Sequence, residues 1–232
     1  MTNTLHRQGP TESLKNDYIV FAHTAKGITR EGSAPKLQEF MRICLKHHPV
    51  NIGDAKQGNF LQDDIDVQKL ISSQGDAAGA TAVFTDLDTL QKVIKELIRA
   101  DLGLSINVSG LMDEVQQCCR KAGIERHSAE HSLGFWGAKD RLPEREIMNF
   151  NTMCGHGMVS FNLIRKMIDY VKLKRLTPKK AAIIMAKCCE CGAFNPVRAE
   201  MLLEKVRKGE REDRSTKSQD PNSKQKKNVL VI

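Results

Sequence analysis

The first half of the chain alternates short apolar runs with stretches that have the periodicity of a helix. The apolar runs have the length of β-strands and fall at 18–22, 82–85 and 102–108. Between and after them, apolar residues recur three and four positions apart, which is typical of helices with one buried face. Such helices are predicted over 33–47, 86–98 and 111–122, with a shorter one near 63–71. This order predicts an α/β protein with a layered β-α-β-α body at 17–123 and some parallel strand pairing.

The second half has a different pattern, because glycines interrupt it and helical periodicity dominates. Helices are predicted over 158–171, 177–187 and 196–206, and the last two begin with a capping residue followed by proline. We therefore expect a mainly helical C-terminal lobe at 124–207, which carries the Cys/His cluster. Residues 1–16 are expected to form a polar N-terminal extension, and 208–232 a disordered basic tail.

Composition narrows the class of protein. The 232 residues are 40% hydrophobic and 28% charged, as in ordinary globular proteins, and no apolar stretch approaches the ~18 residues of a membrane span. The formal net charge of +8 is weak support for a nucleic-acid partner, because the residues after 206 supply half of it. Seven cysteines without a recognisable export signal predict reduced thiols in a cytoplasmic protein.

The segment 152–160 combines a thiol with a glycine-rich turn. Cys154 is followed by Gly155, His156 and Gly157, directly before a predicted helix. The start of a helix presents unpaired N–H groups and a partial positive charge, which stabilise a thiolate and make it a better nucleophile or metal ligand. Residues 153–157 resemble the catalytic-cysteine segment of the proline racemases. The match is five residues long and lacks that family's second cysteine segment, so it implies a reactive thiol and not the activity.

A second thiol segment lies between the last two predicted helices. Cys188, Cys189 and Cys191 occur within four residues, and the following Gly192 permits the non-helical loop in which a Cys-x-Cys pair faces one ion. The helical pair between the two segments would return the chain to Cys154. Cys154, Cys189 and Cys191 with one histidine would make a four-ligand set for zinc. Three thiolates alone would suit an iron–sulfur cluster with one iron left open for substrate.

Histidines and the one tryptophan are candidates to complete this site. The segment His127-Ser-Ala-Glu-His131 resembles the H-x-x-E-H zinc motif of the inverzincins, in which a helix places both histidines on one face. The resemblance covers five residues, and we favour His131 as the fourth ligand of the cysteine site over a separate protease centre. His127, His156 and Cys154 are the candidate catalytic groups. The residues expected to line the cofactor are Gly155, Gly157 and Trp136.

These residues favour a metal-binding protein, with three hypotheses for its function. The first is a metalloenzyme or iron–sulfur enzyme of lyase, hydrolase or isomerase type that acts on a small-molecule substrate. The second is a non-catalytic metal- or cluster-binding subunit that works with a partner subunit. The third is a metal-free thiol enzyme that uses Cys154 as nucleophile and His156 as base. Metal content separates the third hypothesis from the other two.

Overall fold

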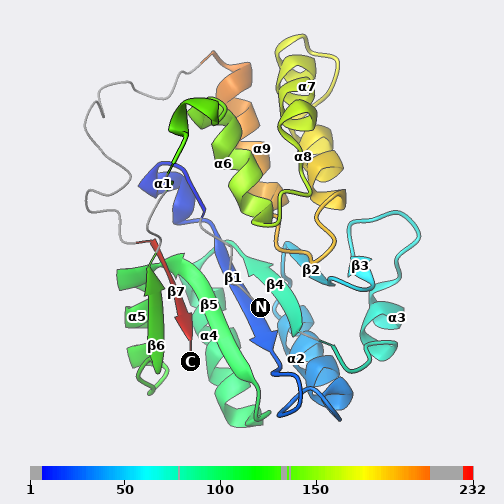
Figure 1. Ribbon diagram of the computed structural model, residues 1–232, viewed down its shortest axis with the longest axis vertical. Coiled ribbons are helices and arrows are strands. Elements are labelled where there is room, and N and C mark those ends of the chain that lie inside the picture. Colours follow the sequence, from blue (N-terminus) through cyan, green and yellow to red (C-terminus); the bar gives the residue numbers. More distant parts are fainter. Residues whose placement is uncertain (1–6, 78, 132–134, 136, 210–226, 232) are drawn as a thin grey trace.

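The computed structural model describes residues 7–77, 79–131, 135, 137–209 and 227–231. Within these residues the centre is a seven-stranded sheet (Figure 1) in the order β3-β2-β4-β1-β5-β7-β6. The strands are β1 (Tyr18–His23), β2 (Asn51–Asp54), β3 (Gly58–Asn59), β4 (Gly79–Phe84), β5 (Ser105–Leu111), β6 (Ser128–His131) and β7 (Lys227–Val231). The helices are α1 (Thr11–Leu14), α2 (Ala34–Lys46), α3 (Val67–Ser72), α4 (Leu87–Ala100), α5 (Met112–Lys121), α6 (Arg145–Cys154), α7 (Phe161–Lys172), α8 (Pro178–Lys187) and α9 (Pro196–Arg207). The expected mixed α/β class is confirmed.

All neighbouring strands of the described sheet pair antiparallel, so the expected parallel pairing is wrong. The strands β1 and β2, which α2 connects, run in the same direction, but β4 lies between them. Likewise, β4 and β5, which α4 connects, lie on either side of β1. The expected helical crossovers are therefore present. Each crossover joins two strands that are separated by one position in the sheet, and an antiparallel strand occupies that position. This arrangement is a split β-α-β connectivity.

Side chains of β1 alternate between two hydrophobic cores, one on each face of the sheet. Tyr18, Val20 and Ala22 pack with α2, α4 and α5. Ile19 and Phe21 pack with the four helices α6–α9, which we call the helical lobe. Figure 1 shows this lobe gathered at the upper end of the sheet, away from α2. None of the described helices is long and apolar enough to cross a membrane.

Several elements were absent from the sequence prediction. The strands β2 and β3 lie in a polar stretch without periodicity. Helix α6 buries Ile147, Phe150 and Met153, and it ends at Gly155, whose φ of 71° is left-handed. The strand β7 lies in the tail that was expected to be disordered, and it pairs with β5 and β6. The rest of that tail from 210 to 226 lies outside the described residues.

A buried ion cluster joins the beginning of the described chain to α9. One carboxylate oxygen of Asp17 accepts hydrogen bonds from Arg198 Nη1 at 2.8 Å and from Arg7 Nη1 at 2.9 Å. Its other oxygen accepts from Asn195 Nδ2 at 2.9 Å. All four residues are less than 5% exposed. The segment expected to be a polar extension therefore supplies a buried contact of the helical lobe.

Candidate functional site

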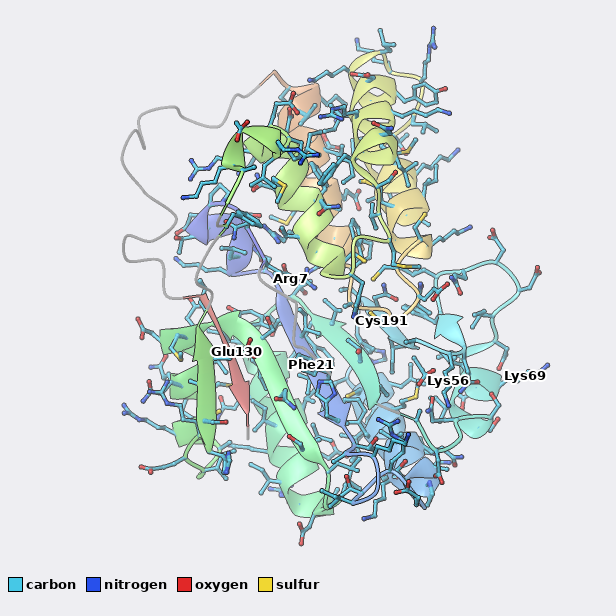
Figure 2. The ribbon with its side chains drawn as sticks, in the orientation of Figure 1. Arg7, Phe21, Lys56, Lys69, Glu130 and Cys191 are labelled. Carbon is cyan, nitrogen blue, oxygen red and sulfur yellow. The ribbon has the colours of Figure 1, made fainter. Side chains whose placement is uncertain are left out.

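Three cysteines and one histidine from two distant segments meet at the base of the helical lobe (Figure 2 labels Cys191 there). Cys154 ends α6, His156 follows in the turn to α7, and Cys189 and Cys191 lie in the link between α8 and α9. The Cys189 Sγ–Cys191 Sγ distance is 3.9 Å, and the Cys191 Sγ–His156 Nδ1 distance is 3.8 Å. Cys154 and Cys189 are both buried in the core of the helical lobe, and the neighbouring Cys189 lowers the pKa of Cys154. We call these four residues the thiol cluster.

The thiol cluster has a closed side and an open side. Cys154 and Cys189 are completely buried. Cys191 is half-buried, and His156 is exposed. A small molecule from solvent therefore meets His156 and Cys191 before it meets the other two sulfurs.

Hydrogen bonds within the thiol cluster shift the pKa values of its thiols in opposite directions. The bond from Cys189 lowers the pKa of Cys154 against the opposing effect of burial, and backbone N–H groups of the following turn contribute. Cys189 also lowers the pKa of Cys191, to which His156 adds. The pKa of Cys189 itself is raised, because its thiol faces both neighbours. The pKa of His156 is raised by Cys191. These bonds favour thiolates at Cys154 and Cys191, with the proton kept on Cys189.

The local structure around Cys154 differs from the expected helix start. Cys154 is the last residue of α6, and α7 begins only at Phe161. The N–H groups that stabilise its thiolate belong to His156, Met158 and Val159 in the turn between the two helices. Gly155 and Gly157 have φ values of 71° and 74°, so this turn depends on conformations that favour glycine. The two glycines therefore shape the turn of backbone donors around the sulfur.

The strands β2 and β3 hold the α8–α9 link in place. Asn59 Nδ2 donates to the carbonyl of Cys189 at 2.9 Å and to that of Ala186 at 3.2 Å. Asn51 Nδ2 donates to the carbonyl of Phe194 at 2.9 Å. Both asparagines are completely buried. Sequence analysis missed them, because an asparagine in a polar stretch carries no signal of a tertiary partner.

The link also approaches the sheet very closely at Gly192. Its φ is +74°, and a Cβ added there would lie 2.6 Å from the backbone nitrogen of Gly53 in β2. Only glycine satisfies both the left-handed backbone and this contact. The position of Cys191 therefore depends directly on the backbone of β2.

Other predicted site residues lie elsewhere. His131 is in β6 and exposed His127 directly precedes it, so the H-x-x-E-H segment lacks the helix that the inverzincin motif requires. The strand β6 lies five positions from β2 in the sheet, which at ~4.8 Å per strand is about 24 Å. The structure thus does not bring these histidines to the sulfurs. Trp136 lies outside the described residues.

The remaining cysteines do not belong to the thiol cluster. Cys188 is half-buried, and its thiol donates to the Ile184 carbonyl at 3.5 Å. Cys44, Cys118 and Cys119 are buried in the core on the opposite face of the sheet. The structure places Cys154 and Cys189 in the same hydrophobic core, with Cys191 packed against it.

Within the described residues, no three His, Cys, Asp or Glu side chains already converge on one metal position. The thiol cluster is instead closed by hydrogen bonds among its own members. No protein-family model, curated protein or solved structure matches the chain.

Proposed function

We propose that the protein binds one zinc-class metal ion at the thiol cluster, through Cys154, Cys189, Cys191 and His156, and acts through it on a small molecule. The spacing of the ligand atoms carries this proposal. Two ligands of one tetrahedral zinc ion lie about 3.8 Å apart, because the zinc–sulfur bond is about 2.3 Å. The 3.9 Å between the two sulfurs agrees with this value, and the 3.8 Å from sulfur to imidazole is slightly longer than the ~3.6 Å that the shorter zinc–nitrogen bond implies. Small side-chain movements would then complete the site.

The same spacing favours one ion over an iron–sulfur cluster. The thiolates of such a cluster bind different irons and must spread around it, whereas Cys189 and Cys191 have sulfurs only 3.9 Å apart. Three thiols with one imidazole are also a common zinc set. Among the histidines, the proposal assigns His156 as the ligand in place of His131, because His156 is the one in contact with a sulfur.

The exposed side of the thiol cluster supports chemistry at the ion. A metal binds thiolates, so binding would release the proton that Cys189 holds between its neighbours. His156 is the exposed ligand and lies on a two-glycine turn, which makes it the ligand that water or substrate replaces most easily. An ion with such an open position supplies polarisation of a carbonyl or activation of water. We therefore favour hydrolase or lyase chemistry.

Metal analysis tests this proposal. We expect about one zinc ion per chain in the purified protein, and sulfur-to-metal charge-transfer absorption after cobalt(II) substitution. Cys191→Ser should lose the ion and the absorption. Cys188→Ser is the matched control. Cys188 lies three positions before Cys191 in the sequence, and its thiol donates to the Ile184 carbonyl of α8 and not to the thiol cluster. A wild-type protein that takes up neither zinc nor cobalt would overturn the proposal, as would equal metal content in both variants.

A metal-free thiol enzyme is the second candidate, and the Cys191–His156 contact favours it. That contact places an imidazole beside a half-buried sulfur, which is the arrangement of a nucleophile and its base. The nucleophile would then be Cys191, because Cys154 is completely buried. Stoichiometric alkylation of Cys191 in a wild-type protein shown to be free of metal would favour this candidate over the first.

A further inference from the structure

A basic pocket lies at the end of the helical lobe farthest from the thiol cluster. Its volume is about 550 Å³, and its lining consists of Lys174, Arg175, Leu176, Thr177, Lys180 and Arg207. Its lining residues belong to the turn from α7 to α8, the start of α8 and the end of α9. Figure 1 shows the turn and the end of α9 at the top. The pocket lies at the first turn of α8 and the thiol cluster beyond its last residue, and this ten-residue helix is about 15 Å long. The two sites therefore share no residue.

Among the residues that the structure describes, acidic groups balance few of the cations of the basic pocket. Arg207 pairs with Glu204 at 2.7 Å. Within the described part of the chain, no carboxylate forms an ion pair with Lys174, Arg175 or Lys180. Like charges that line one concave surface raise the local concentration of anions. This surplus of positive charge is suited to a ligand with more than one negative charge.

The backbone holds these cations in defined positions. Lys174 has a φ of 55°, a left-handed conformation that normally favours glycine after a helix end and costs a lysine about 1 kcal/mol. The Arg175 guanidinium lies over the Tyr170 ring at 5.9 Å from its centroid. Thr177 caps α8 by accepting from the Lys180 backbone N–H at 3.2 Å, and the helix start adds partial positive charge.

We propose that the basic pocket binds a small molecule through its phosphate or diphosphate group. Lys174 and Lys180 supply point charges, and Arg175 supplies a planar donor fork that matches phosphate oxygens. The pocket volume lies within the range of roughly 300–1,000 Å³ that small-molecule sites have. This site is independent of the metal proposal, so either can fail without the other.

Calorimetric titration of the full chain with inorganic pyrophosphate and with ADP, at constant ionic strength, tests the proposal. We expect saturable binding of about one molecule per chain, weakened about tenfold or more by Lys180→Ala and by Arg175→Ala. Lys174→Gly is the decisive variant. Because glycine suits the left-handed backbone, this variant should be at least as stable as wild type and still bind about tenfold more weakly.

Lys172→Ala is the matched control, because Lys172 is an exposed lysine in the last turn of α7 that does not line the pocket. The affinity of this variant should stay within about twofold of wild type, because Lys172 does not line the pocket and salt screens its exposed charge. The proposal is wrong if wild type shows no saturable binding, or if Lys172→Ala weakens it as much as Lys174→Gly. Binding of single-stranded RNA without any binding of pyrophosphate or ADP would also overturn it, in favour of a general polyanion surface.

Discussion

The two faces of the sheet bury their cysteines in different surroundings. On the face covered by α2, α4 and α5, burial raises the pKa of Cys118 and of Cys119 to about 11. On the lobe face, Cys154 is completely buried and Cys191 is half-buried, yet their pKa values are lowered, because hydrogen bonds from Cys189 outweigh burial. The comparison teaches that burial alone makes a thiol inert, whereas burial with aligned donors prepares it to bind or react.

The two faces also differ in how their helices are attached. Apolar side chains join α2, α4 and α5 to the sheet, with a part-buried hydrogen bond from Tyr18 Oη to Glu114 of α5 at 2.6 Å. The helical lobe has an apolar interface too, but buried polar groups reinforce it at two places. One is the pair Asn51 and Asn59 under the α8–α9 link, and the other is Asp17 between two arginines. Most polar atoms of these groups are paired, although Asn51 Oδ1 and Arg7 Nε have no partner among the described residues. Removal of one partner leaves further buried polar atoms unpaired, so this attachment is sensitive to single substitutions.

Thiol labelling should give the largest contrast between the faces. In chelator-treated native protein at pH 7, we expect iodoacetamide to label Cys191 and to leave Cys118 and Cys119 unlabelled. A thiol with a pKa of about 11 is ionised to only about one part in 10⁴ at that pH, and both are buried. Peptide mass spectrometry over time measures the rates, and labelling in urea gives the control in which all three react alike. Equal labelling rates of Cys191, Cys118 and Cys119 in the native protein would contradict the proposed difference between the two faces.

The buried ion cluster should show the largest effect on stability. Asp17→Ala removes the carboxylate that Arg7 and Arg198 share, and we expect a loss of about 3–5 kcal/mol in the free energy of unfolding. Urea denaturation followed by circular dichroism measures it. Asp63→Ala is the control, because Asp63 is 82% exposed in its pair with Lys187 and should change stability by about 1 kcal/mol or less. Similar losses for both variants would contradict this account of the lobe attachment.

A smaller loss is expected at the strand β3. Asn59→Ala leaves the carbonyls of Ala186 and Cys189 without this donor, which should cost about 1–3 kcal/mol. Metal affinity should fall with it, because the same carbonyl contact positions the Cys189 backbone. Asn162→Ala, on the exposed surface of α7, should change stability by about 0.5 kcal/mol or less. If Asn59→Ala behaved like Asn162→Ala in both measurements, β3 would have no role in holding the link.

Local patterns in the sequence predicted most of the helices and part of the site. Asp86 caps α4 by accepting a hydrogen bond from the Thr89 N–H, and Asn195 caps α9 by accepting one from the Arg198 N–H. Such caps can be predicted because they involve residues only three positions apart. The Cys-x-Cys-Gly segment likewise indicated a loop with two convergent sulfurs. The choice of His156 over His131 and the roles of Asn51 and Asn59 depend on contacts between segments distant in sequence. No local periodicity records such contacts.

The antiparallel pairing was missed for a related reason. The order β1-α2-β2 is the same whether β2 lies next to β1 or one strand away, since a helix can cross either distance. What decides the question is β4, which comes later in the chain and pairs with both strands. The topology is thus set by a segment outside the unit from which the parallel pairing was inferred.

The contact between Gly192 and Gly53 has a consequence for protein engineering. Transplanting the Cys-Glu-Cys-Gly segment into another scaffold would carry over its sulfurs but not the glycine-containing strand that its backbone contacts. A recipient protein without a glycine at the equivalent strand position would hold the loop farther from the sheet and move the sulfurs apart. The unit to transfer is therefore the loop together with its β2–β3 hairpin, not the cysteine motif alone.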